Sequence, residues 1–315
     1  MNSARQQVAI VEVGPRDGFQ SIETLIPTAT KIALIEQLYG AGVRRMEATS
    51  FVSERALPQM ADAAEIVAAA ARLPGLDAQV LVPTVRHAER ALKAGATHLS
   101  AVLSVSERHN QANVRRTPMD SVADYKQMMA LLPAGGVMRL NLSTAFDCPY
   151  VGRIERDAVL DLLEPLVAIA ADVEIALCDT TGRADPAQVR DYFTAARARF
   201  GEVRAWAFHG HDTYGLGAAN ALAAWDAGVR VIDAAVAGLG GCPYAPGATG
   251  NVATEDLVWM FSRMGIACGI DLEALTVVGG EVARLPGAQI GGRVRNALAA
   301  RAAQGASSQG TPSST

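Results

Sequence analysis

Two histidines separated by one glycine, His209-Gly210-His211, give the sequence its strongest chemical signal. The segment around them has the apolar character of a β-strand, and side chains two positions apart on a strand point the same way. With the carboxylate of Asp17, two imidazoles that leave coordination positions open suit Mn²⁺, Mg²⁺ or Fe²⁺ better than a closed structural zinc site. The alternative is a pair of hydrogen-bonded histidines that binds no metal.

A glycine-rich segment, Gly238–Asn251, carries Cys242. Two glycines precede this thiol and a proline follows it, which predicts a mobile loop rather than a packed helix or strand. A mobile thiol beside a metal can donate or accept a proton, and this is the role we expect for Cys242. The same glycines could instead cradle a phosphate group. We interpret Cys178 and Cys268 as structural, and the role of Cys148 stays open.

Further polar side chains lie at the ends of predicted strands. Arg16 and Asp17 follow the first strand, Glu47 ends the second, and Asp179 ends the sixth. In parallel α/β barrels the carboxyl ends of the strands meet at one mouth, so we expect these groups to converge there with the histidine pair. The alternative for Arg16 and Asp17 is an ordinary ion pair at a strand end.

The elements that must position these residues alternate between short apolar strands and longer helical stretches. The strand candidates are 8–13, 43–49, 78–83, 98–104, 137–144, 173–179, 204–211 and 229–236. The helix candidates between them are 31–40, 58–72, 86–94, 121–132, 156–170, 186–200 and 215–227. This alternation predicts an α/β protein with a closed (β/α)8 TIM barrel rather than an open doubly wound sheet. No GxGxxG follows an early strand, which argues against a Rossmann domain.

The chain is expected to form one domain, a TIM barrel over residues 1–300. Additional C-terminal helices, near 255–264 and 272–283, should pack on the side or mouth of the barrel. The stretch Ser106–Thr117 after the fourth strand, which includes His109, is interpreted as a polar loop whose role stays open. Residues 301–315 are rich in Ala, Ser, Gly and Gln, and predict a disordered C-terminal tail.

Composition and charge narrow the range of partners. Half of the residues are apolar, 19% are charged and the formal net charge is −4, so no general attraction to nucleic acid is expected. No stretch approaches the roughly 18 apolar residues of a transmembrane helix, and the short polar N-terminus resembles neither a signal nor a transit peptide. The four cysteines include no CxxC pair, which is typical of reduced thiols. We expect a cytoplasmic protein with a small-molecule substrate, no nucleic acid and no membrane.

Four segments closely resemble the 3-hydroxy-3-methylglutaryl-CoA lyases, a branch of the metal-dependent acyl-CoA lyase and synthase barrels. They are 11–20 (VEVGPRDGFQ), 47–60 (EATSFVSERALPQM), 209–215 (HGHDTYG) and 236–257 (VAGLGGCPYAPGATGNVATEDL). The likeness covers roughly residues 8 to 295, and the last segment is specific to the lyase branch. It implies metal-assisted retro-Claisen cleavage of a 3-hydroxy-3-methylglutaryl-CoA-like acyl-CoA into acetyl-CoA and acetoacetate, a reaction of leucine degradation. Members of this family are usually homo-oligomers.

Carried over by position, the resemblance assigns roles to particular residues. A divalent metal, Mg²⁺ or Mn²⁺, would be held by Asp17, His209, His211 and Asn251. Arg16 would stabilise charge on the thioester carbonyl, with Glu47, Asp179 and His209 as further members of the catalytic network. Cys242 would act in acid–base chemistry near the leaving enolate. Asn251 enters the ligand set only through the resemblance.

Two departures from the family pattern leave the acyl group of the substrate open. The first motif continues as Gly-Phe-Gln-Ser-Ile at 18–22, where familiar lyases have Gly-Leu-Gln-Asn-Glu. The stretch after the fourth strand contains His109 and the pair Arg115-Arg116. Both departures lie near the expected substrate mouth, and neither removes a residue that the cleavage requires.

Two other functions remain as alternatives. A condensing enzyme of the same superfamily, similar to homocitrate or isopropylmalate synthase, would share the Arg-Asp-Gly and His-x-His elements. The Gly-Gly-Cys-Pro-Tyr segment at 240–244 argues against it. A catalytically silent barrel that only binds a CoA ester or a protein partner is the alternative from another class. The presence of every chemically required residue argues against that interpretation.

Overall fold

The computed structural model describes residues 7–242 and 245–308, and within them eight parallel strands close into a barrel. Around the ring the order is β1-β10-β9-β8-β5-β4-β3-β2. These strands are β1 (Ala9–Glu12), β2 (Arg45–Ser50), β3 (Asp77–Val82), β4 (His98–Ser104), β5 (Val137–Ser143), β8 (Glu174–Asp179), β9 (Ala205–Gly210) and β10 (Val231–Ala234). The predicted TIM barrel is therefore confirmed, and no strand extends more than one residue beyond its predicted range.

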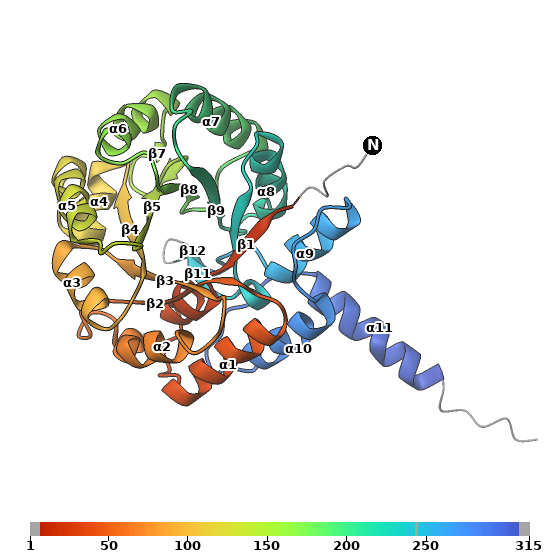
Figure 1. Ribbon diagram of the computed structural model, residues 1–315. Helices are drawn as coiled ribbons and strands as arrows, with labels where there is room; N and C mark the ends of the chain where they lie inside the picture. Colours follow the sequence, from red (N-terminus) through yellow and green to blue (C-terminus); the bar gives the residue numbers. More distant parts are fainter. Residues whose placement is uncertain (1–6, 243–244, 309–315) are drawn as a thin grey trace, which may run out of the picture.

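Helices surround the strands and cover their outer faces (Figure 1). They are α1 (Thr28–Gly40), α2 (Ala63–Ala70), α3 (Val85–Lys93), α5 (Pro118–Leu131), α6 (Arg156–Ile169), α7 (Pro186–Arg199) and α8 (Gly217–Asp226). The outward side chains of the strands, such as Leu177, Phe208 and Ile232, are fully buried in this interface. Burial of such apolar area is the main stabilisation of the barrel.

The inward faces of the strands carry buried charges. Partners in the parallel register share a face of the sheet, and Arg139 pairs with Glu174 while Asp233 pairs with His209. Arg139, Glu174 and Asp233 are each at most 4% exposed. Because a buried charge is tolerated only when it is paired, these residues form a polar network inside the barrel.

The stretch Ser106–Thr117, predicted to be a loop, contains helix α4 (Glu107–Val114). Ser106 caps its N-terminus by accepting a hydrogen bond from the backbone amide of His109. Thr117 then begins α5 with a capping box to Asp120. Two caps eleven positions apart divide the polar stretch into two helices, and this local chemistry outweighs its low apolar content.

After the eighth barrel strand the chain forms α9 (Thr254–Arg263), α10 (Leu272–Val282) and α11 (Val294–Ser308). The first two are the predicted C-terminal helices. Figure 1 shows α11 pointing away from the barrel. The sequence predicted a disordered tail from residue 301, whereas α11 continues to Ser308. Alanine, the best helix former, is frequent in this segment. Residues 309–315 lie outside the described ranges.

The described structure also contains two short antiparallel hairpins. One pairs β6 (Asp147–Cys148) with β7 (Gly152–Arg153), and the other pairs β11 (Gly241–Cys242) with β12 (Ala245–Thr249). The second hairpin corrects the prediction of an irregular glycine-rich loop. Its small residues let the two strands approach closely, since a Cβ at Gly250 would lie 2.9 Å from the backbone carbon of Gly240. None of the helices in the described ranges has the length and apolarity that a membrane crossing requires.

Candidate active site

A single-turn π-helix, η1 (Gly14–Gly18), places Arg16 and Asp17 at the mouth of the barrel. The carbonyl of Val13 accepts hydrogen bonds from the amides of Arg16 and Asp17, at 3.1 and 2.7 Å. The turn packs too closely for a larger residue at its end, because a Cβ at Gly18 would lie 2.8 Å from the side chain of Leu239. Single π-turns of this kind are frequent at functional sites.

Asp17, His209 and His211 form a compact group of metal-binding atoms. One ligand atom from each lies within 4.8 Å of the others, and His211 Nε2 is 3.8 Å from Asp17 Oδ2. Burial opposes ionisation of Asp17, but the charge of Arg16 and a hydrogen bond from His211 hold its pKa well below the usual range. The predicted strand pair of histidines therefore faces an ionised carboxylate, and the donor set suits a divalent cation.

Asn251 lies beside this group, in the segment after β12. Its Nδ2 donates to Asp17 Oδ2 at 2.7 Å and to the carbonyl of Leu239 at 3.1 Å, while its buried Oδ1 has no hydrogen-bond partner. A buried polar oxygen without a partner costs free energy. The amide of Asn251 can be turned by 180° so that its oxygen and nitrogen exchange places. Its oxygen would then face a cation beside Asp17, and that contact would remove this cost. Gly240 makes room for the amide, because a Cβ there would lie 2.8 Å from Asn251 Nδ2.

Arg16 lies between two carboxylates. It donates to Glu47 and, at 2.5 Å, to Asp17 Oδ1. Gln20 Nε2 also donates to Asp17 Oδ1, at 2.7 Å. Burial lowers the pKa of Arg16, but Glu47 and Asp17 outweigh it and raise that pKa. The ion pair considered from the sequence is therefore present, and the same guanidinium also lines the cavity described below.

Asp179 does not point into the mouth. In the register of β8 and β9, Cys178 pairs with His209 and Asp179 pairs with Gly210, so Asp179 lies on the outward face. Its carboxylate accepts hydrogen bonds from the amides of Arg183 and Ala184, at 3.1 and 3.2 Å. Burial raises its pKa to about 6. The structure thus places Asp179 behind the site, where it holds the turn that follows β8.

Cys242 is part of β11, at the same mouth, and its neighbour Gly241 lines the cavity. The side chain of Cys242 lies outside the described part of the structure, as do Pro243 and Tyr244. The role predicted for this thiol therefore stays a prediction. The three other cysteines are unpaired, and Cys178 lines the cavity, where burial raises the pKa of its thiol.

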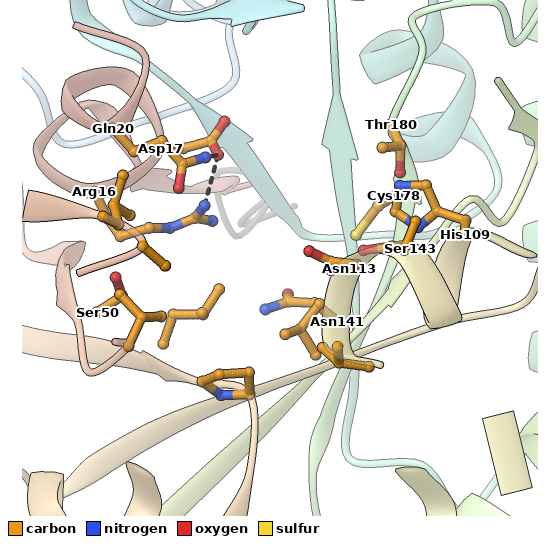
Figure 2. Close-up of a pocket in the computed structure, with 18 of the residues that line it drawn as sticks. Arg16, Asp17, Gln20, Ser50, His109, Asn113, Asn141, Ser143, Cys178 and Thr180 are labelled. Carbon is orange, nitrogen blue, oxygen red and sulfur yellow. Dashed lines mark hydrogen bonds and ion pairs between the residues drawn. The ribbon is translucent and has the colours of Figure 1, made fainter. Parts of the chain in front are cut away.

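The cavity at the mouth has a volume of about 790 Å³. Figure 2 shows Arg16, Asp17 and Gln20 on one side and His109, Ser143, Cys178 and Thr180 on the other. An apolar wall also lines it, formed by Val52, Ala56, Leu57, Leu81, Pro83 and Val102. This size and mixed lining are typical of sites for small molecules.

His109 reaches this cavity from α4, and its role stays open. It is 5% exposed, and its Nδ1 lies 2.7 Å from Ser104 Oγ. Burial lowers its pKa, so the imidazole is neutral near pH 7. Arg115 also lines the cavity, whereas Arg116 pairs with Asp124 outside it.

The unusual residue Ile22 does not reach the cavity. It is 3% exposed and packs in the apolar cluster formed with Phe19 and Ile26. Ser21 Oγ donates to the carbonyl of Gly18 at 2.8 Å. The departure of the first motif from the family pattern therefore changes the packing beside the mouth. It does not bring the side chain of Ile22 into the cavity.

Two charged residues near the site were missed from the sequence. Asp233 Oδ2 lies 3.1 Å from His209 Nδ1 and 2.6 Å from Arg139 Nη2. Burial raises the pKa of Asp233, but Arg139 and His209 outweigh it and lower that pKa. A usable signal was present, because each residue is the only charged residue in its strand. Such a charge must be paired when the strand is buried.

Comparison with known proteins places this geometry in a family. Residues 7–282 match the HMGL-like protein family. Mitochondrial hydroxymethylglutaryl-CoA lyase of Mus musculus is 41% identical over 280 residues, which are 89% of this chain and 86% of the mouse protein. The cytoplasmic 3-hydroxy-3-methylglutaryl-CoA lyase of Rattus norvegicus is 39% identical over 275 residues, 87% of this chain and 80% of the rat protein.

A solved structure shows the same relationship. The HMG-CoA lyase of Acinetobacter baumannii, determined in complex with coenzyme A and 3-methylmalate, superposes with a TM-score of 0.87. The two chains are 38% identical, and the match covers 94% of this chain and 97% of the other.

Proposed function

The chain belongs to the HMGL-like family, and from this membership and its site we infer that it is a carbon–carbon lyase. Its substrate is 3-hydroxy-3-methylglutaryl-CoA, which it cleaves into acetyl-CoA and acetoacetate. The observation that carries this function is the group of Asp17, His209 and His211 beside Arg16 at the barrel mouth, with both histidines buried. A synthase of the same superfamily is not favoured, because the matched relatives are lyases.

A divalent metal, Mg²⁺ or Mn²⁺, is the cofactor that this donor set fits. Asp17, His209 and His211 would hold it, and the unpartnered Oδ1 of Asn251 would supply a fourth ligand. Bound there, the cation would lower the pKa of the substrate's tertiary hydroxyl and orient the oxygens beside it. The group has two imidazoles and one carboxylate, which leaves positions for substrate oxygens.

Side chains of the protein would stabilise the negative charge that develops during cleavage and would transfer the proton. Arg16 is held by Glu47 and Asp17 in a fixed orientation. We propose that it donates hydrogen bonds to the thioester oxygen as enolate charge develops there, where preorganised cations stabilise most strongly. Cys242, on the hairpin over the mouth, would transfer the proton that the enolate carbon needs.

Asp179 would contribute by position rather than by proton transfer. Its carboxylate fixes the turn that carries Thr180 into the cavity. This proposal replaces the role that the family resemblance suggested, because Asp179 lies on the outward face of β8.

Several further properties are proposals that rest on the family. They are a homo-oligomeric assembly, a single domain through residue 300, and a place in leucine degradation. A cytoplasmic location is supported by a cytoplasmic relative, although mitochondrial relatives also match.

The direct test is product formation. The chain, supplied with Mg²⁺ or Mn²⁺, should release acetyl-CoA and acetoacetate from 3-hydroxy-3-methylglutaryl-CoA. It should not form free CoA from acetyl-CoA and a 2-oxo acid. Rapid CoA release in that second assay would identify a synthase, and binding of the thioester without turnover would identify a silent barrel. Cleavage of only a bulkier 3-hydroxyacyl-CoA would keep the mechanism and change the substrate.

A further inference from the structure

Asp233 is a buried carboxylate that the functions assigned above do not use. It lies on β10 directly opposite His209 on β9, so both side chains point into the barrel. Asp233 Oδ2 is 3.1 Å from His209 Nδ1, and the residue is 4% exposed. We propose that Asp233 is a positioning residue that fixes the ring orientation and the tautomer of His209 for metal binding. This inference rests on the proposed metal site.

The chemistry of the contact determines which nitrogen of His209 faces the cation. An ionised carboxylate can only accept hydrogen bonds, so His209 Nδ1 must carry the hydrogen and donate it to Asp233. His209 Nε2 then keeps its lone pair and becomes the ligand atom. A carboxylate behind a ligating imidazole also raises the basicity of the nitrogen that binds the metal.

Arg139 makes Asp233 suitable for this role. Its Nη2 donates at 2.6 Å to the same oxygen, Asp233 Oδ2, that accepts from His209. Arg139 is 1% exposed, so the two charges neutralise each other inside the barrel. A buried carboxylate without such a partner is strongly disfavoured. The shared oxygen therefore stays both charged and in one place.

Arg139 is itself held from two further directions. Its Nη1 donates to Glu174 Oε1 at 3.1 Å, and its Nε donates to Asn141 Oδ1 at 2.9 Å. Glu174 also accepts from Arg45 Nη2 at 3.0 Å, near the N-terminal ends of the strands. A continuous line of hydrogen bonds thus runs from the bottom of the barrel to His209. Only the planar fork of arginine can make these three contacts from one side chain.

The opposite end of the barrel contains a similar pair that serves as an internal comparison. His98 Nδ1 lies 2.6 Å from Asp77 Oδ1, at the first residues of β4 and β3. Neither residue belongs to the group of metal-binding atoms found among the described residues. The Asp77–His98 pair therefore has the same chemistry as the Asp233–His209 pair without its position beside the other ligands.

The test measures metal affinity rather than activity. Asp233→Asn keeps the shape of the side chain but can offer an amide N–H to His209, so Mn²⁺ should bind about 10- to 100-fold more weakly. Asp77→Asn, the matched control, should bind Mn²⁺ like the wild type. Affinities would be measured by equilibrium dialysis, with circular dichroism to verify the fold. Wild-type affinity in a folded Asp233→Asn protein would overturn the inference.

A second measurement needs no variant that alters Asp233. In the metal-free wild-type protein, ¹⁵N spectra of the imidazoles should show His209 with its hydrogen on Nδ1, its signals being identified by their loss in His209→Gln. A hydrogen on Nε2 would overturn the inference. A wild-type chain that binds no Mn²⁺ would instead defeat the proposed metal dependence, and the proposed role of Asp233 would fall with it.

Discussion

His211 and Asn251 form an antiparallel backbone bridge at the barrel mouth. The bridge fixes Asn251 beside the end of β9, and the Asn251 amide lies 2.7 Å from Asp17 Oδ2. Side chains from three segments that are distant in sequence therefore meet at a position set largely by main-chain pairing. Because the backbone defines the site, removal of one ligand side chain should weaken metal binding without unfolding the barrel.

Metal dependence is the first prediction. Prolonged chelation should abolish turnover, and Mg²⁺ or Mn²⁺ should restore it. His211→Ala should keep its fold but lose metal on gel filtration, with affinity at least about 10-fold weaker, because changing a residue that only hydrogen-bonds to a ligand already has an effect of this size. His87→Ala removes a histidine that lines the same cavity outside the ligand group, and it should retain metal. Full activity in a protein shown by elemental analysis to lack divalent metal would contradict this prediction.

The second prediction concerns Arg16, whose guanidinium contacts Glu47 and Asp17 at once. In Arg16→Lys a single ammonium cannot hold both carboxylates and also face the substrate. The turnover number should fall by about 10²- to 10³-fold, the loss typical of a donor to a developing oxyanion. KM should change much less.

Arg90→Lys is the matched control for Arg16→Lys. Arg90 pairs with Glu54 at the surface, where both side chains are more than 40% exposed. Exposed pairs contribute little, so this variant should have wild-type kinetics. A near-normal turnover number in Arg16→Lys would show that Arg16 forms only an ordinary ion pair at the strand end, which is the alternative that the sequence left open.

The sequence predicted the barrel well because strand and helix periodicity are local signals. It predicted the positions of His209 and His211 for the same reason. Asp179 shows where this reasoning stops, since a strand end does not reveal which face a side chain occupies. A shift of one residue moves a side chain to the opposite face, and Asp179 is one residue beyond Cys178, which does line the cavity.

Other features depend on long-range contacts that local patterns cannot supply. Asn251 joins Asp17 across 234 positions of sequence, and only the family resemblance indicated it. Ile22 was expected near the mouth but packs into an apolar cluster, because its direction depends on neighbours from later strands and helices. Helix α4 was missed because its caps, rather than an apolar face, define it.

The third prediction concerns stability and pH. Burial raises the pKa of Glu12 and of Glu255 to about 7. The folded protein therefore binds more protons than the unfolded chain between about pH 4.5 and 7. The free energy of unfolding should fall as the pH rises through this window, by at most about 1.4 kcal/mol per pH unit for each group, and level off above it.

Glu12→Gln tests this account with an isosteric neutral side chain. The Glu12 carboxylate accepts from the amides of Gly14 and Val236 and from Thr254 Oγ1. Glutamine can accept from the two amides and donate to the hydroxyl, so the fold should be kept. Urea unfolding at pH 5, 6, 7 and 8 should show a shallower decline than in the wild type. An unchanged slope would show that Glu12 is already ionised when folded at pH 5.

The last prediction concerns Cys242, on the hairpin that lies at the mouth. If its thiol transfers the proton that the enolate requires, Cys242→Ser should lower turnover by about 10²- to 10⁴-fold. KM should change far less, because the side chain adds little to ground-state binding. Cys268→Ser, which changes a cysteine outside the cavity lining, should behave as the wild type.

Alkylation provides an independent measurement on the unmodified sequence. Cys178 also lines the cavity, but burial raises the pKa of its thiol and should make it slow to react. A thiol reagent should therefore inactivate the enzyme by modifying Cys242 first, and substrate should slow that modification. Peptide mapping would identify the modified residue. Rapid modification of Cys242 with retained turnover, or a Cys242→Ser variant of normal activity, would make this cysteine a structural residue of the hairpin.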